Sequence, residues 1–270
     1  MSSRFERIFT GTGKPLIAVV HLPPLPGTPG YDAGKGIEGI LAAVQRDLDA
    51  LLAQPGIDAI LFRNTGDRPY RRRADLASVA ALARVAGTLA PRDRPLPFGI
   101  DFRCDARAAL AVAAATGAAF ILAAAGGVYA SDMGLWSTDV AALLRRRGEL
   151  RADEVAIFMD LTPAFAAPLG GRELAERARS LACSSQPDAV LASGSVDAVR
   201  AVKEAVGELA PVLVNGGVTP GNLAAYLRAA DGAIVAPASE EGKTEPPLDE
   251  ERLRLLVAEK RNGLAGEWPG

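Results

Sequence analysis

The sequence alternates eight times between a short apolar run and a longer segment whose apolar residues recur at helical spacing. Short runs of this kind are typical of parallel strands buried on both faces, and they span 16–20, 58–62, 96–100, 119–123, 154–159, 188–192, 211–214 and 232–237. Helical spacing follows in 36–53, 74–90, 105–115, 138–147, 171–182, 195–209, 220–229 and 249–260. Eight such units in about 250 residues predict an α/β fold, a TIM (β/α)₈ barrel. A doubly wound sheet with an extra lobe is the alternative.

The barrel hypothesis makes a specific prediction about one residue from each apolar run. These residues should all lie on strands of one closed barrel: Leu16, Ile60, Ile100, Ile121, Ile157, Val190, Val214 and Ile234. With 49% hydrophobic and 23% charged residues, the composition is that of a globular protein. We therefore expect a single barrel domain over residues 1–270, with a loose tail from about residue 263.

Charge and hydropathy exclude several classes of function. The formal net charge is −2, from 30 basic and 32 acidic residues, which argues against a general nucleic-acid binder. The arginine clusters 71–73 and 145–147 are interpreted as solvated helix ends. The first residues lack the apolar core of a signal peptide, and no apolar run approaches 18 residues, so no transmembrane span is predicted. We expect a cytoplasmic protein; homo-oligomerisation and peripheral membrane association remain open.

A glycine pair between the seventh strand and the seventh helix predicts an anion site. The chain leaves the strand at Gly216 and Gly217, and the helix is expected to start at Pro220 with Thr219 as its N-cap. Backbone N–H groups at such a turn, with the positive end of a helix dipole behind them, suit a phosphate. The predicted cup comprises Asn215, Gly216, Gly217, Val218, Ala238 and Ser239. An ordinary turn that needs glycines is the alternative.

Polar side chains follow at least six of the strands, whereas the strand bodies are apolar, which predicts a small-molecule site at the carboxyl ends of the strands. The candidate acid–base residues are His21, Asp101 and Asp160. His21 is the only histidine, and a structural imidazole is its alternative role. Asp160 is either a base whose pKa is raised by burial or an ion-pair partner for an arginine.

The candidate substrate-binding residues are Arg63, Asn64, Asp67, Arg103, Asp132 and Ser193. Asp67 also fits a turn, and Asp101 and Arg103 also fit a mutual ion pair. No metal-binding signature is present, and no cofactor is specified, although a flavin phosphate would suit the predicted cup. No lysine stands at a strand end, which disfavours a Schiff-base aldolase.

Several motifs, in order along the whole chain, resemble the BtpA family, which includes SgcQ-like proteins. They are His21-Leu-Pro-Pro-Leu-Pro-Gly27, Asn64-x-Gly66-Asp67-x-Pro69, Asp105-Ala106, Asp132-x-Gly134, Val214 to Asn222 and Asp231 to Val235. The resemblance implies a barrel related to the ribulose-phosphate-binding group, with some members associated with photosystem I biogenesis. This chain departs from the family pattern in having Arg63 where an acidic residue is usual, in lacking an asparagine near Asp101, and in having a short loop after the sixth strand. It also has 124–127, Ala-Ala-Gly-Gly, where a polar stretch is usual.

Two functional hypotheses follow. In the first, the protein binds a phosphorylated small molecule and acts on it as an isomerase, lyase or transferase. In the second, it is a non-catalytic assembly or regulatory factor that retains the phosphate cup. The alanines after the fourth strand favour the second, and the charged strand ends favour the first.

Overall fold

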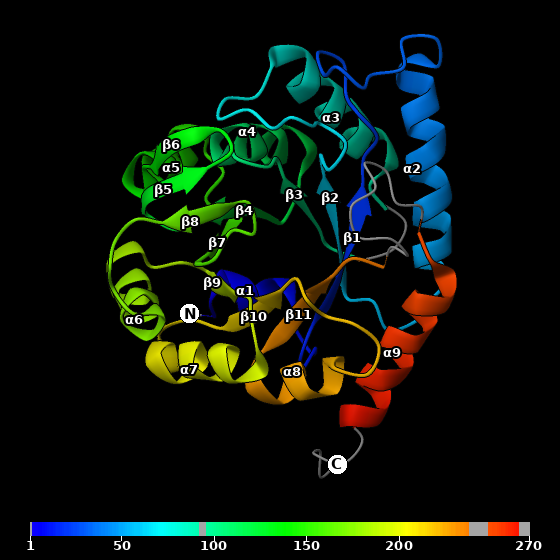
Figure 1. The fold of residues 1–270 in the computed structure, drawn as a ribbon. Helices are drawn as coiled ribbons and strands as arrows, with labels where there is room; N and C mark the ends of the chain where they lie inside the picture. Colours follow the sequence, from blue (N-terminus) through cyan, green and yellow to red (C-terminus); the bar gives the residue numbers. More distant parts are fainter. Residues whose placement is uncertain (1, 92–95, 238–247, 265–270) are drawn as a thin grey trace.

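The computed structural model describes residues 2–91, 96–237 and 248–264, and eight parallel strands in it close into a barrel (Figure 1). The order around the ring is β1-β11-β10-β9-β7-β4-β3-β2. The strands are β1 (Leu16–His21), β2 (Ala59–Arg63), β3 (Phe98–Asp101), β4 (Phe120–Ala124), β7 (Ala156–Asp160), β9 (Ala189–Ala192), β10 (Val212–Asn215) and β11 (Gly232–Val235). All eight residues predicted from the apolar runs lie on these strands, so the TIM-barrel prediction is confirmed.

Helices surround the strand ring (Figure 1). They are α2 (Gly36–Leu52), α3 (Leu76–Leu89), α4 (Ala106–Thr116), α5 (Val140–Glu149), α6 (Leu174–Ser185), α7 (Val196–Val206) with the 3₁₀ turn η1 (Gly207–Leu209), α8 (Leu223–Ala229) and α9 (Glu250–Leu264). Within the ranges described, none of the helices combines the length and the apolar character that crossing a bilayer demands.

Alternation along the strands divides the core into two layers. One set of strand residues packs outward against the helices, and the other fills the barrel interior. The interior strand residues are Ile17, Val19, Ala59, Leu61, Phe120, Leu122, Ala156, Phe158, Ala189, Leu191, Leu213 and Ile234. Gly99 belongs to this layer, because a Cβ atom there would lie 2.2 Å from the Phe120 ring.

Continuing the same alternation by two residues gives the layer that faces the carboxyl ends of the strands. It contains one residue from each strand or the residue just after it: His21, Arg63, Asp101, Ala124, Asp160, Ser193, Asn215 and Ala236. We call this set the mouth layer. Six of its eight members are polar or charged, in contrast to the apolar layer beneath.

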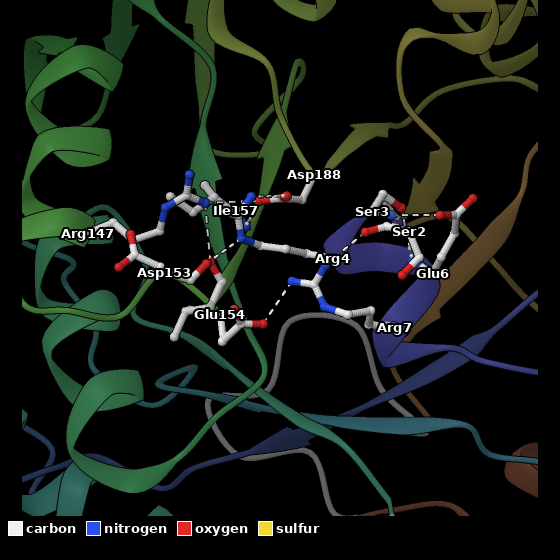
Figure 2. A network of polar contacts seen from close by, with 11 residues as sticks. Ser2, Ser3, Arg4, Glu6, Arg7, Arg147, Asp153, Glu154, Ile157 and Asp188 are labelled. Atoms are coloured by element: carbon white, nitrogen blue, oxygen red, sulfur yellow. Dashed lines mark hydrogen bonds and ion pairs between the residues drawn. The ribbon is translucent and has the colours of Figure 1, made fainter.

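A short helix that the sequence analysis did not anticipate, α1 (Arg4–Ile8), closes the opposite end of the barrel. It starts with a capping box formed by Ser3 and Glu6. Phe5 and Phe9 join the interior core, where the ring of Phe5 lies 5.9 Å from that of Phe158. A polar network around Asp188 ties the helix to the barrel wall (Figure 2).

A second, three-stranded antiparallel sheet stands beside the mouth, next to α5 (Figure 1). It consists of β5 (Gly127–Ser131), β6 (Gly134–Thr138) and β8 (Ala166–Pro168), in the order β6-β5-β8. Tyr129 and Trp136 are cross-strand partners, with their rings stacked 5.1 Å apart, and Phe165 extends the stack. The sequence analysis assigned no strand to these residues, so these strands are an addition to the predicted fold.

The start of the seventh barrel helix was predicted wrongly. α8 begins at Leu223 with Asn222 at its N-cap, not at Pro220 with Thr219 as cap. The Thr219 N–H donates to Asn222 Oδ1 at 2.7 Å, which makes residues 219–222 a turn. Gly221 has φ of +101°, outside the helical region, so the helix cannot begin earlier. With 7 residues, α8 contributes a weaker dipole than the sequence analysis assumed.

Candidate functional site

A cavity of about 1370 Å³ opens at the carboxyl ends of the strands. Its floor includes five members of the mouth layer: Arg63, Asp101, Ala124, Asp160 and Asn215. Its walls come from the β2–α3 loop, from residues 102–107 after β3, from β6 with the start of α5, and from residues 162–165 after β7. The cavity therefore lies where TIM barrels carry their active sites.

Asp160 is the titratable group at the centre of this floor. Its carboxylate accepts hydrogen bonds from Asn215 Nδ2 at 2.9 Å and from the Thr162 N–H at 2.8 Å. Burial raises the pKa of Asp160 to about 6; the Asp101 charge also raises it, while the two hydrogen bonds and Arg63 lower it. A carboxyl group with this pKa exchanges a proton readily near neutral pH, as a general acid or base must.

Replacing Asp160 with Asn tests this raised pKa without any ligand. A carboxyl whose pKa is higher in the folded state than its ordinary 3.8 favours folding at low pH, and this contribution is lost as the pH rises through about 6. The stability of Asp160→Asn relative to the original chain should therefore increase by about 2–3 kcal/mol from pH 4 to pH 7. Urea unfolding at several pH values measures this change, and parallel profiles would contradict the raised pKa.

Arg63 and Asp101 form a buried ion pair at the ends of neighbouring strands. Arg63 Nε donates to Asp101 Oδ2 at 2.5 Å, and the two side chains are 8% and 12% exposed. The predicted alternative, a pair between Asp101 and Arg103, is therefore wrong. The ion pair also gives a reason for Arg63 at this position, since its charge neutralises the adjacent carboxylate.

Arg103 lies in the cavity wall against two aromatic rings that contact each other. Its guanidinium carbon is 5.7 Å from the centroid of Tyr70 and 5.7 Å from that of Phe165. Within the described residues its side chain forms no ion pair or hydrogen bond, and its Nε is buried without a partner. The next residue, Cys104, has φ of +69°, a strained conformation for a residue with a Cβ atom. Burial raises the pKa of the Cys104 thiol to about 12.

His21 lies in the mouth layer but is not among the residues that line the cavity. Its Nδ1 is 2.6 Å from Thr65 Oγ1, and its Nε2 is buried with no partner among the described residues. Burial, reinforced by the charges of nearby arginines, lowers the pKa of His21 to about 3, so the imidazole is neutral at physiological pH.

Asn64 and Asp67, predicted to bind substrate, hold the proline-rich loop after β1. Asp67 accepts hydrogen bonds from the Leu25 N–H at 2.8 Å and from Asn64 at 3.0 Å. Asn64 in turn accepts the backbone N–H of Arg103 at 2.7 Å. Both side chains line a separate hollow of about 40 Å³, not the large cavity.

Two further predicted residues lie outside the cavity lining. Asp132 is exposed in the turn between β5 and β6. Ser193, in the mouth layer, has its hydroxyl 2.7 Å from that of Thr162. Ser193 could therefore influence the cavity through Thr162, which does line it.

The glycine pair adopts the backbone that its sequence suggested. Gly216 and Gly217 have φ of +92° and +74°, and Gly216 lines the cavity. Their N–H groups donate no hydrogen bond within the described residues. Val218 is buried in the outer core. The other half of the predicted cup, Ala238 and Ser239, falls outside the described residues.

Sequence reasoning missed the aromatic and basic wall of the cavity. Trp136 and Phe165 line it, and so do Arg71, Arg72 and Arg73, which were interpreted as a solvated helix end. The alternation in 127–138, with a turn at 132–133, could have indicated the hairpin that carries Trp136. Across the described ranges, no group of three or more His, Cys, Asp or Glu side chains is arranged to hold a metal ion.

Comparison with known proteins gives both family and fold. A model of the BtpA family matches residues 12–262. The sgc region protein SgcQ of Escherichia coli is 37% identical over 84% of this chain and 86% of its own length. The photosystem I biogenesis protein BtpA of Synechocystis is 32% identical over 94% and 90%.

Solved structures similar to the chain are TIM barrels of low sequence identity. A structure of native KDPGal aligns with TM-score 0.54 and 16% identity, covering 93% of this chain and 96% of that one. N-(5'-phosphoribosyl)anthranilate isomerase from Pyrococcus furiosus aligns with TM-score 0.56 and 14% identity, covering 92% and 99%. At these identities the similarity establishes the fold alone.

Proposed function

The chain belongs to the BtpA family, and from that premise we propose that it binds a phosphorylated small molecule in the mouth cavity and acts on it by acid–base chemistry. The observation that carries the proposal is Asp160, a carboxyl group with a pKa of about 6 that lines a large open cavity. Structural neighbours that include a phosphoribosyl-anthranilate isomerase add support at the level of fold.

In this proposal the residues of the cavity have distinct roles. The turn at Gly216 and Gly217 receives the phosphate through backbone N–H groups. As a carboxylate, Asp160 takes a proton from a C–H or O–H group of the substrate and returns it to another atom, as isomerisation and lyase reactions require. Asn215 and Thr162 orient the carboxylate through their hydrogen bonds. His21, fixed as a neutral imidazole beside Thr65, supports the mouth and does not line the cavity.

The phosphate site is tested by placing a carboxylate at Gly217. In Gly217→Asp the added charge should repel the anion and weaken the binding of glucose 6-phosphate at least tenfold, about 1.4 kcal/mol. Because Gly217 has φ of +74°, any side chain there strains the backbone, so Gly217→Ala is the matched control. The measurement is calorimetric titration of both variants and the original chain.

The Gly217→Ala variant should bind more tightly than Gly217→Asp, since a Cβ at this position meets only the Tyr226 hydroxyl at 3.7 Å, an ordinary contact. Equal weakening in the two variants would mean that strain, not charge, is responsible. If the original chain binds no phosphorylated compound, the glycine pair is only a turn and the proposed function fails.

A second candidate is a non-catalytic assembly or regulatory factor that binds the same ligand. Ala124 ends β4 at the mouth and Ala125 follows it, so neither side chain supplies a polar group there, and one relative is a photosystem I biogenesis protein. Ligand binding that is unaffected by Asp160→Asn, without turnover of any bound compound, would favour this candidate over an enzyme.

A further inference from the structure

We infer that the ligand of the mouth cavity carries a second anionic group, a carboxylate or a phosphate, and that Arg103 binds it. This inference rests on the proposed function, since it assigns the far end of the same ligand. The ligand is then a compound with an anionic group at each end. The second group binds at Arg103, separately from the glycine turn.

The first argument is the charge that remains uncompensated at the mouth. Arg63 is neutralised by Asp101 at 2.5 Å, and His21 is neutral. Arg103 is close enough to both Arg63 and His21 to affect their pKa values, yet within the described residues it has no acidic partner. A cation in this position is stabilised when an anion arrives from outside.

The second argument is that Arg103 is held in place before any ligand binds. Its guanidinium lies against the rings of Tyr70 and Phe165, whose centroids are 6.4 Å apart, and Tyr70 is itself fixed by a hydrogen bond to the Thr65 carbonyl at 3.1 Å. The backbone of Arg103 is anchored to Asn64 and is followed by the strained turn at Cys104. A side chain fixed in this way loses little conformational entropy when it binds a ligand.

The third argument is the chemistry of the guanidinium group. It has only donors, and its planar fork matches the two oxygens of a carboxylate or phosphate. Its guanidinium already lies against two aromatic rings, while its terminal nitrogens make no hydrogen bond within the described residues. A group that accepts two hydrogen bonds therefore suits it better than another ring.

The fourth argument is the arrangement of the strands around the ring. Arg103 follows β3 and the glycine turn follows β10, and these strands are four positions apart in either direction around the eight-stranded barrel, so they face each other across the mouth. Asp160 ends β7, which lies two positions from each of them (Figure 1). A ligand held at both ends would present its middle carbons to the candidate acid–base group.

Two matched pairs of probes test the inference by calorimetric titration. Glucose 6-phosphate and 6-phosphogluconate share six carbons, and the second adds a carboxylate; fructose 6-phosphate and fructose 1,6-bisphosphate differ by a phosphate. We expect the original chain to prefer the two-ended member of at least one pair by tenfold or more. The pair that shows the preference identifies the second group as carboxylate or phosphate.

Arg103→Met keeps an apolar stem against the two rings and removes the charge. It should reduce the preference to less than twofold while changing the affinity for the single phosphates less than threefold. Arg103→Lys keeps the charge but lacks the planar pair of donors, so it should retain part of the preference. It replaces Arg103→Met in the test if that variant does not fold. Arg179→Met, an exposed arginine on α6 outside the cavity, is the charge-matched control and should preserve the preference.

Three results would overturn the inference. If single phosphates bind and neither pair shows a preference, the second anionic site does not exist, although the proposed function stands. If the full preference survives in Arg103→Met, or in Arg103→Lys where the Met variant does not fold, another group binds the second anion. If none of the four probes binds, the proposed function and the inference both fail.

Discussion

Replacement of Asp188 by alanine is expected to lower the free energy of unfolding by about 3–5 kcal/mol. Asp188 stands just before β9, and its carboxylate, with a side chain 9% exposed, binds Arg4 at 3.0 Å and Arg147 at 3.2 Å. It also accepts the Ile157 N–H at 2.8 Å, at the start of the neighbouring strand (Figure 2). Its loss leaves two cations without their acidic partner and a strand N–H without its acceptor, and it removes one of the polar contacts that hold α1 to the barrel.

Asp231 provides the matched control, because it uses the same arrangement in a more exposed setting. It precedes β11, accepts the Val212 N–H at 2.7 Å and pairs with Lys203 at 2.7 Å, with a side chain 30% exposed. Since an exposed pair contributes less, Asp231→Ala should cost about 1–2 kcal/mol. Urea unfolding of the two variants measures the difference, and equal losses would show that α1 is not anchored through Asp188.

The barrel could be predicted from the sequence because each of its strands is a separate apolar run that local composition alone identifies. Strands such as β9 and β11 are buried on both faces, so every residue in them is apolar and the run stands out from its neighbours. The helices between them have one apolar stripe, as α7 shows with Val199, Val202 and Val206. Local composition and period therefore determine the count of units and, with it, the fold.

The two additions to the barrel could not be predicted, because neither is determined locally. α1 has five residues, too few for a periodic pattern, and Phe5 within it and Phe9 at its C-cap are explained only by the open barrel end that they fill. The strand β5 pairs with β8, which lies some 35 residues further along the chain. β8 has only three residues, and one of them is a proline. Tertiary packing, not propensity, makes these segments regular.

The candidate site also contains residues that the local sequence predicts and one that it does not. Alternation correctly brings Arg63, Asp101 and Asp160 to one layer, since each ends a strand. It fails for Arg103, because β3 ends at Asp101 and the turn at Cys104 redirects the chain. Asp101 pairs instead with Arg63, its register partner on β2, and the positive φ angle at Cys104 is one that a cysteine gives no reason to expect. The positive φ angles of Gly216 and Gly217 were predictable, since glycine itself indicates positive φ.

The imidazole of His21 is expected to remain neutral down to a pH of about 4 in the folded protein. Its pKa is about 3, because burial and the charges of Arg63, Arg103 and Arg68 all disfavour the imidazolium form. His21 is the only histidine in the chain, so its Hε1 proton gives a single imidazole signal in a proton NMR spectrum. That signal should keep its chemical shift between pH 8 and pH 4.5, whereas in urea it should titrate near 6.5.

This depressed pKa has a defined consequence for stability. The unfolded chain takes up a proton below 6.5 and the folded chain does not, so the stabilising contribution of the neutral imidazole is complete above 6.5 and declines as the pH falls. The decline amounts to about 3 kcal/mol by pH 4. Over much of this range Asp160 acts in the opposite direction, since its raised pKa favours folding at lower pH.

The pH dependences of stability that come from His21 and Asp160 should therefore partly cancel in the original chain. Single substitutions should make each of them measurable. His21→Asn, which keeps a polar atom beside Thr65, should remove the loss of stability on the acid side, and Asp160→Asn should make that loss steeper. In the double variant the two changes should cancel, because each removes one of two opposing proton equilibria. Two results would contradict this prediction: an NMR midpoint near 6.5 in the folded protein, or a stability profile of His21→Asn that is parallel to that of the original chain. Either result would show that the imidazolium form is tolerated at the mouth. The nearby arginines would then lower the pKa of His21 less than their positions imply.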